Sequence, residues 1–475
     1  MNAFLLTVLL WQASPPAGAK LAQAGPGATA PQQPQQQQQP PAVPPPFQPE
    51  VSDPMLAPMP PAPVQVASWD EALAVLRQRS PELRTALAQV EAAAGQRRAA
   101  LGGLLPTLGG TVSVQYNVIG PTVSSFGGGA TGSATGNFRT STPLGTASLT
   151  AAMPLFDLRA LRSLRAADST RRASELSLDE TRRQLTGALA GALARVASSE
   201  RLAEVNRVNL RSALERLALA QRRLELGAGT QLDVIRLRQD AESVRATLVS
   251  GDETLRQARD ALGLVLGLEQ PVGLGREVSL EELLRRGQQE CHRLEKVEAR
   301  PDLAAARARL EAADRSVSAA QALYWPTLEA QSSAVALTVD PGFARVPVWN
   351  LGAVLSLPFY TGERAGLIQQ ARAQAETVRQ EVVSRQRAVS VEVAQARREL
   401  DVAQTEQEIA ARERELAAEN DRLTRRAFEV GTGTSQDLVV SAAALRQAEL
   451  SLVVRQFQLY QARIEAFLAE AACDW

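Results

Sequence analysis

The chain contains the stretch Leu-Gly-Ala-Gly-Thr-Gln-Leu-Asp-Val-Ile at residues 226–235. Its near-copy, Val-Gly-Thr-Gly-Thr-Ser-Gln-Asp-Leu-Val, follows 204 residues later at 430–439. A long proline-free segment precedes each copy. Glycine commonly ends a helix, and threonine commonly begins one. Each copy is therefore predicted to be the turn of a helical hairpin.

The repeat extends to both halves of the chain. Pro154 aligns with Pro358 at the same offset of 204, whereas Pro81 aligns with Pro301 at an offset of 220. The first half therefore carries 16 extra residues between Pro106 and Pro154. Loops tolerate insertions and long packed helices do not, because a slip rotates every side chain off its seam. The insertion thus marks a loop.

Each half is predicted to contain a helix, a β-hairpin, a very long helix, the glycine turn and a return helix. The long helices span residues 157–226 and 361–430, and the return helices end near residues 268 and 471. Eight apolar residues at a strict spacing of seven predict coiled-coil packing in the second long helix. They are Ile368, Ala375, Val382, Val389, Ala396, Ala403, Ala410 and Ala417.

Charge-poor segments supply the predicted strands, at residues 107–118, 146–153, 327–338 and 348–357. Only one charged residue, Arg139, occurs between Pro106 and Phe156. Strands of this length with alternating faces are typical of membrane barrels. Four strands are too few to close one, so the pattern predicts that subunits pool their strands. Three subunits would give a barrel of twelve.

The other segments complete the expected organisation. A short apolar run and Ala22-Gln23-Ala24 predict a signal peptide over residues 1–24. Residues 25–67 are expected to form a Pro/Gln-rich disordered leader. The two structural repeats are expected at 68–270 and 298–475, with a connector at 271–297.

Composition argues against several other functions. The 51 basic and 51 acidic side chains balance, so there is no electrostatic case for nucleic acid. The single histidine, His292, and two cysteines supply no convergent catalytic cluster. We expect no enzyme, no cofactor and no resident metal. A glycine-rich match at residues 127–132 is no nucleotide site, because no helix follows it.

The sequence resembles the TolC-type outer-membrane efflux family over roughly residues 68–472. The resemblance rests on the duplicated helix–Pro-Thr-Leu–strand unit and on the two glycine turns. It implies a mainly α fold with membrane β structure: a trimeric 12-stranded β-barrel in outer-membrane lipid and an α-helical barrel across the periplasm. It implies an exit duct for a tripartite pump or type I secretion. The implied partners are a periplasmic adaptor and an RND, ABC or MFS inner-membrane transporter.

The resemblance also implies site residues. The glycine turns would form the periplasmic tips that meet the adaptor and set the aperture, although a simple capped helix turn explains the same residues. These are Gly227, Gly229, Thr230, Asp233, Gly431, Gly433, Thr434 and Asp437. Aromatic residues near the strand ends are expected at the membrane interface: Phe156, Tyr324, Trp325, Trp349, Phe359 and Tyr360.

Two alternatives stay open at this point. Cys291 and Cys473 could form a disulfide in an oxidising periplasm or remain two free thiols, and a metal site with His292 is disfavoured. A soluble or periplasmic coiled-coil scaffold or adaptor would explain the helices, but it would leave the charge-poor hairpins unexplained. The exported cargo is not specified by the sequence.

Overall fold

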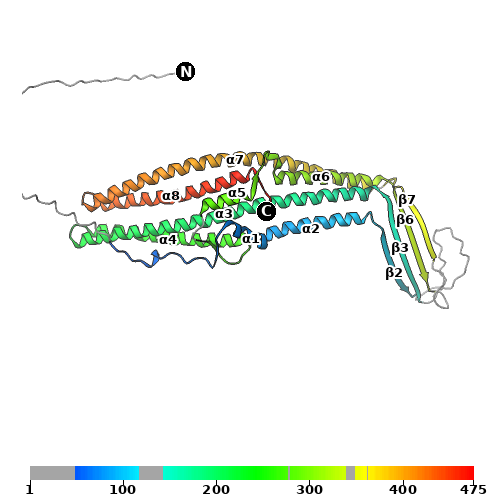
Figure 1. Cartoon of the computed structure of the whole chain (residues 1–475), viewed down its shortest axis with the longest axis horizontal. Coiled ribbons are helices and arrows are strands. Elements are labelled where there is room, and N and C mark those ends of the chain that lie inside the picture. Colours follow the sequence, from blue (N-terminus) through cyan, green and yellow to red (C-terminus); the bar gives the residue numbers. More distant parts are fainter. Residues whose placement is uncertain (1–48, 117–142, 276–278, 339–347, 361) are drawn as a thin grey trace, which may run out of the picture. The chain divides into compact units, whose positions relative to one another are not determined.

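The computed structural model describes residues 49–116, 143–275, 279–338, 348–360 and 362–475. They belong to one compact unit that begins at Pro49. Long helices lie side by side, and a single four-stranded sheet adjoins one end of them (Figure 1). Within the described ranges, no helix combines the length and the apolar character needed to cross a membrane.

Two helices of 68 residues dominate the helical part. They are α3, Leu158–Glu225, and α7, Gly362–Glu429. At 1.5 Å per residue each is about 102 Å long. The return helices α4, Gln231–Val265, and α8, Ser435–Leu468, pack along them as hairpin partners, as the glycine turns predict.

Shorter helices continue along the sheet-side part of the long ones. They are α2, Pro81–Gly102, against α3, and α6, Pro301–Gln321, against both α3 and α7. Both start with proline at the first position, where its missing N–H costs nothing. Two short helices thus lie beside each long helix: α2 and α4 beside α3, and α6 and α8 beside α7.

The strands are β2, Thr107–Gln115, β3, Leu144–Asp157, β6, Thr327–Leu337, and β7, Val348–Ser356. Their order is β2-β3-β6-β7, and all neighbours are antiparallel. Pairing of β3 with β6 joins the two predicted hairpins into one sheet. β3 runs further than the predicted 146–153, and the ends predicted at 117 and 118 lie outside the described residues.

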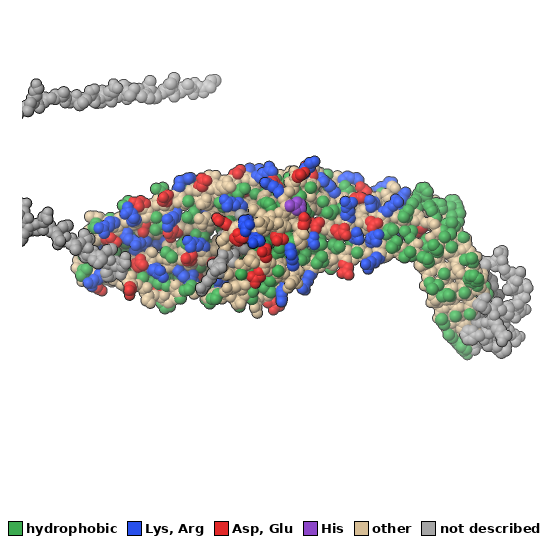
Figure 2. Space-filling model, viewed as in Figure 1, with side chains coloured by type: hydrophobic (Ala, Val, Ile, Leu, Met, Phe, Trp, Pro, Cys, Tyr) green, Lys and Arg blue, Asp and Glu red, His purple; other side chains and the backbone are tan. Residues whose placement is uncertain are grey.

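The two faces of the sheet differ sharply. Directly paired residues share a face, so the register assigns each side chain. One face is almost wholly apolar, with Leu108, Val112, Val114, Leu149, Met153, Trp349, Leu351 and Leu355. The other face is mainly polar, with Thr111, Ser113, Thr146, Ser148, Thr150, Gln331, Ser333 and Asn350, although Val335, Val348 and Val354 also lie on it. Charged side chains are spread over the helices, whereas hydrophobic ones are prominent on the sheet (Figure 2).

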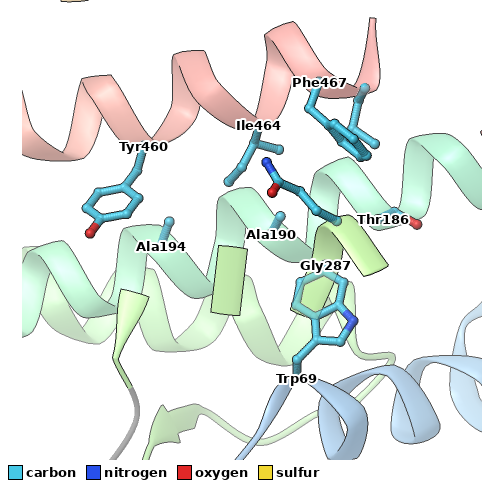
Figure 3. A pocket seen from close by; sticks show the side chains of 10 residues that line it. Trp69, Thr186, Ala190, Ala194, Gly287, Tyr460, Ile464 and Phe467 are labelled. Atoms are coloured by element: carbon cyan, nitrogen blue, oxygen red, sulfur yellow. The ribbon is translucent and has the colours of Figure 1, made fainter. Parts of the chain in front are cut away.

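The middle of the helical part carries the connector between the repeats. Its helix α5, Leu280–Gln289, lies near α1, Trp69–Arg79, a short helix that the sequence analysis did not predict. Gly287 permits this approach, because a Cβ there would lie 3.2 Å from the Trp69 ring. A cavity of only about 20 Å³ remains between these helices, α3 and α8 (Figure 3). Such a volume holds about one water molecule.

The predicted disordered leader needs correction at its C-terminal end. The sequence predicts a tether as far as residue 67, but β1, Val64–Val66, pairs in parallel with β4, Val272–Leu274. Further back, Val51, Met55 and Leu56 pack against buried residues of α3 and α4. Apolar side chains interspersed among the prolines supply this contact, and the proline-rich composition hides them. The proposed signal and residues 25–48 of the leader lie outside the described residues.

A disulfide joins the connector to the C-terminal end. β5, Cys291–Arg293, pairs with β8, Ala471–Cys473, and Cys291 is bonded to Cys473. Both cysteines are buried. The bond closes a loop with a sequence separation of 182 residues. Long loops lose the most entropy when closed, so the bond restricts the unfolded chain strongly.

The unfolded chain should therefore migrate faster in non-reducing than in reducing denaturing electrophoresis. Cys291→Ser should abolish this difference, because the loop is then open under both conditions. Equal mobility of the wild-type protein with and without reductant would show that the two thiols are free.

Candidate functional site: the paired helical turns

The two glycine turns have the same backbone geometry. Gly227 has φ +71° and Gly431 has φ +84°, a region that side chains with a Cβ rarely adopt. The following N–H groups return to the end of the helix: Ala228 N donates to Arg223 O at 2.9 Å and Thr432 N to Ala427 O at 2.9 Å. These are the bonds of a glycine-terminated helix.

The second glycine of each turn is required by space rather than by φ. A Cβ on Gly229 would lie 3.2 Å from the backbone nitrogen of Leu224. A Cβ on Gly433 would lie 3.0 Å from the backbone nitrogen of Phe428. The chain folds back tightly onto the helix it has just left, so a side chain at either place would require the backbone to shift by a few tenths of an ångström.

Each return helix begins with a complete capping box. Thr230 N and Oγ1 donate to Asp233 Oδ2 at 3.0 and 2.7 Å, and Asp233 N donates back to Thr230 Oγ1 at 3.2 Å. Thr434 and Asp437 repeat this arrangement. Hydrogen bonds from Thr434 lower the pKa of Asp437. Burial raises the pKa of Asp233, but hydrogen bonds from Ser435 and Thr230 outweigh it and the net shift is downward.

The turns are held to each other by arginines of the first hairpin. The Arg223 guanidinium donates to the Phe428 carbonyl and lies 4.5 Å from the centroid of its ring. Arg236 Nη1 donates to Ser435 Oγ at 3.4 Å. Below these contacts an apolar cluster crosses between the hairpins: Ala220, Val234, Leu237, Phe428 and Leu438.

Two ion pairs lock the hairpins together further from the turns. Arg216 of α3 lies 3.3 Å from Asp421 of α7, and both side chains are only 5% exposed. Asp240 of α4 lies 2.6 Å from Arg446 of α8. Sequence reasoning missed these pairs. Each joins residues about 205 positions apart, and no local pattern indicates that separation.

We call the region near the turns where the two hairpins contact each other the joint. Within a hairpin, long apolar seams hold the helices. Between hairpins near the turns, a small apolar cluster and a few arginine contacts do so. A shift of one hairpin against the other would exchange these polar contacts and leave both helices intact, which is how packed elements switch between discrete states.

The predicted interface aromatics separate into two groups. Phe156, Tyr324, Trp325, Phe359 and Tyr360 all lie at the helix-side end of the sheet, and each is substantially exposed. Trp349 does not join them, because it lies near the opposite end of β7. There its indole donates to Ser332 Oγ at 2.8 Å. Tyr116, which sequence reasoning did not select, follows the corresponding end of β2 and is also exposed.

The remaining sequence candidates contribute no chemistry to the turns. The glycine-rich match at 127–132 lies outside the described residues. His292 Nδ1 lies 3.1 Å from Asp474 Oδ2 on the exposed surface near the disulfide. Among the residues that the structure describes, no group of three or more His, Cys, Asp or Glu side chains could hold a metal ion.

Removing one partner of the buried ion pair should destabilise the joint strongly. Asp421→Ala leaves the Arg216 charge buried without its counterion, which typically costs about 3–5 kcal/mol. Thermal unfolding followed by helical circular dichroism would measure this loss. Glu225→Ala is the matched control: its pair with Arg222 is exposed, so the loss should be below about 1 kcal/mol. Equal effects of the two changes would contradict the assigned role of the buried pair.

The turns should also loosen in acid. The folded-state pKa values of Asp233 and Asp437 lie below the ordinary value of 3.8. Their caps therefore stabilise fully above that pH and are lost as pH falls through the lower folded values. The protection factors for amide hydrogen exchange at residues 230–237 and 434–441, which correct for the intrinsic pH dependence of exchange, should fall over this range. Asp437→Asn should remove the pH dependence from the second turn alone.

The chain is similar to known proteins in both sequence and structure. A sequence model described as outer membrane efflux protein matches residues 72–268 and 295–468. The chain is also similar to solved structures. The outer membrane protein VceC from Vibrio cholerae is 21% identical, with 84% of this chain and 95% of VceC covered and a TM-score of 0.68.

Two further solved structures are similar to this chain over most of its length. CusC is 18% identical, with 89% of this chain and 99% of CusC covered and a TM-score of 0.71. The MtrE outer membrane channel of Neisseria gonorrhoeae, in its open state, is 19% identical, with 89% and 97% covered and a TM-score of 0.67. At these identities the likeness concerns the fold. Because the family model matches well over half of the chain, in two blocks that coincide with the repeats, the chain belongs to the outer membrane efflux protein family.

Proposed function

We propose that three copies of this chain form the outer-membrane exit duct of a tripartite efflux pump or type I secretion system. The observation that carries this proposal is the four-stranded sheet with one apolar face, one polar face and two open edges. The duct is a passive conduit across the periplasm and the outer membrane, and a periplasmic adaptor and an inner-membrane transporter complete the machine.

The outer edges of the sheet, at β2 and β7, are suited to pairing with neighbouring chains. β2 and β7 each pair on one side only among the described strands. In lipid an unpaired strand edge leaves backbone groups without hydrogen bonds, so the sheet must close on itself. β2 and β7 run in opposite directions. The β2 edge of one copy can therefore pair with the β7 edge of the next and keep the antiparallel alternation. Three copies in a ring give twelve strands.

The two faces fit this closure. With the apolar face outward against lipid, the polar Thr, Ser, Gln and Asn side chains line the interior, as in barrels with water-filled channels. The five aromatics at the helix-side end would form one interfacial girdle. Trp349 and Tyr116 would contribute to the other. A soluble scaffold would have to leave the same apolar face in water, so that alternative is not favoured.

The helices need neighbours as well. α7 carries a row of apolar residues at a spacing of seven, and each of them is more than half exposed in the single chain. They are Val402, Ile409, Leu416 and Leu423, and Val430 directly after the last residue of α7 continues the spacing. A sustained seven-residue stripe is the seam of a coiled coil. We assign this stripe to the contact between α7 and the next copy in the ring.

The glycine turns would form the periplasmic tips of this ring. The adaptor would meet them there, and a shift of the two hairpins about the Arg216–Asp421 and Asp240–Arg446 pairs would widen the entrance. The adaptor would act by binding the open arrangement more tightly than the closed one.

Negative-stain electron microscopy of detergent-extracted protein tests the assembly. Threefold particles more than about 100 Å long are expected from the helix length. A monomer or dimer that stays in solution without detergent would overturn the proposed duct.

A change in one turn should impair transport without preventing assembly. Gly431→Val places a β-branched side chain at φ +84°, so it should distort the second turn and reduce export in a pump-dependent resistance or secretion assay. Trimers should still form, because the strands and the long helices are untouched. Gly95→Ala is the control: its added Cβ meets nothing within 4 Å, and export should be unchanged. Full export by the Gly431→Val protein would contradict the tip assignment.

A further inference from the structure

The two helical hairpins are repeats, but among the described residues an additional segment packs along the first of them. Residues 51–60 lie along the seam between α3 and α4, and we call them the strap. Val51, Met55 and Leu56 of the strap pack on a cluster that is almost completely buried. Its members are Leu210, Ala213, Leu214, Ala241, Val244 and Leu248.

Polar contacts fix the strap at three levels. Asp53 Oδ1 accepts from Met55 N at 2.8 Å, and Asp53 Oδ2 accepts from Arg245 Nη2 at 2.7 Å. Arg207 Nε donates to the Ala57 carbonyl at 3.0 Å. Arg259 Nη1 donates to the Pro60 carbonyl at 2.9 Å. Prolines lack an N–H, so a proline-rich segment offers its carbonyls, and arginines on the helices bind them.

The second hairpin lacks two of the three strap-binding arginines, since Arg463 stands at the position equivalent to Arg259. At the offset of 204, Arg207 corresponds to Ala411 and Arg245 to Glu449. Leu210 corresponds to Arg414, which lies 3.7 Å from Glu449 on the partly exposed surface. The first seam is therefore apolar and needs a cover, whereas the second has a charged pair at the same level.

We propose that the strap reserves the α3–α4 seam and so makes the two hairpins inequivalent to a partner. This inference rests on the proposed function, because the partner is the helical hairpin of a periplasmic adaptor. The strap packs on a cluster that extends along α3 to Leu214, which leaves about 17 Å of helix before α3 ends at Glu225. An adaptor helix on this hairpin is confined to that length, and the α7–α8 seam has no such limit.

The strap itself is tested with two matched cysteines. Ala213 lies beneath the strap and is fully buried, and its repeat equivalent, Ala417, is partly exposed. In the otherwise intact chain, whose native cysteines are bonded, Ala213→Cys should react with maleimide about tenfold or more slowly than Ala417→Cys, because the strap must first open. Equal rates would overturn the proposal.

Release of the strap should remove the difference. Asp53→Ala eliminates both the bond to Arg245 and the bond to Met55 N, so labelling at position 213 should accelerate toward the rate at 417. Deletion of residues 51–60 should have the same effect. Glu50→Ala is the matched control, because Glu50 is exposed just outside the strap, and labelling should stay slow. An unchanged slow rate after deletion of the strap would show that the strap does not cover the seam.

The partner is tested with the purified adaptor that supports export with this chain. With the strap deleted, the adaptor should slow labelling at position 213 about tenfold, because its helix then occupies the vacated seam. Gln436→Cys, on the exposed second turn, reports tip docking separately. Protection at 436 without protection at 213 would overturn the strap's role in docking. No protection at 436 would count against the proposed tip contact instead.

Discussion

Backbone hydrogen bonding at the edges of the four-stranded sheet is the constraint on which the rest of this structure depends. Among the strands that the structure describes, β2 and β7 lie at the edges of the four-stranded sheet, and each lacks a partner on its outer side. In lipid, one chain with such edges would leave backbone groups without hydrogen bonds. In the proposed trimer each copy supplies the bonds that its neighbour lacks. The diameter of this proposed ring of strands then sets how far apart the helices of the three copies lie. Their length, seams and exposed stripe are read most simply as consequences of that requirement.

The long helices are held in place by two kinds of contact, apolar within each hairpin and polar between the hairpins. Within each hairpin, small residues such as Ala241 and Ala403 let the helices approach closely along their full length. Toward the turns, buried ion pairs connect one hairpin to the other. Such pairs add little net stability compared with apolar packing, but they depend sharply on geometry. That dependence suits a joint with two discrete arrangements better than a continuous apolar seam would.

Duplication gave the two halves the same turn and the same strands, and later divergence made their surfaces different. Gly227 and Gly431 both adopt a positive φ that favours glycine, so the two halves have the same residue there. Arg245 and Glu449 face different neighbours, so they differ. The strap belongs to this second kind of feature. It shows how a repeated scaffold can present two unlike faces to a partner without any change in its backbone.

Sequence alone determined the features that local chemistry imposes. Glycine and threonine at fixed positions define the turns, the seven-residue spacing defines the coiled-coil seam, and the period of two with few charges defines the strands. The repeat offsets even located the insertion. These signals are local or periodic, so one chain suffices to read them.

Only the tertiary structure decided which distant segments meet. The pairing of β3 with β6, the Arg216–Asp421 and Asp240–Arg446 pairs and the packing of residues 51–60 on α3 and α4 all join positions far apart in the chain. Trp349 was grouped with the other aromatics by its residue type, yet register placed it at the other end of the sheet. The proline-rich composition predicted a disordered leader to residue 67. Composition does not indicate that three apolar side chains of this segment pack on α3 and α4. Contacts of this kind depend on the three-dimensional arrangement of surfaces, which no local pattern encodes.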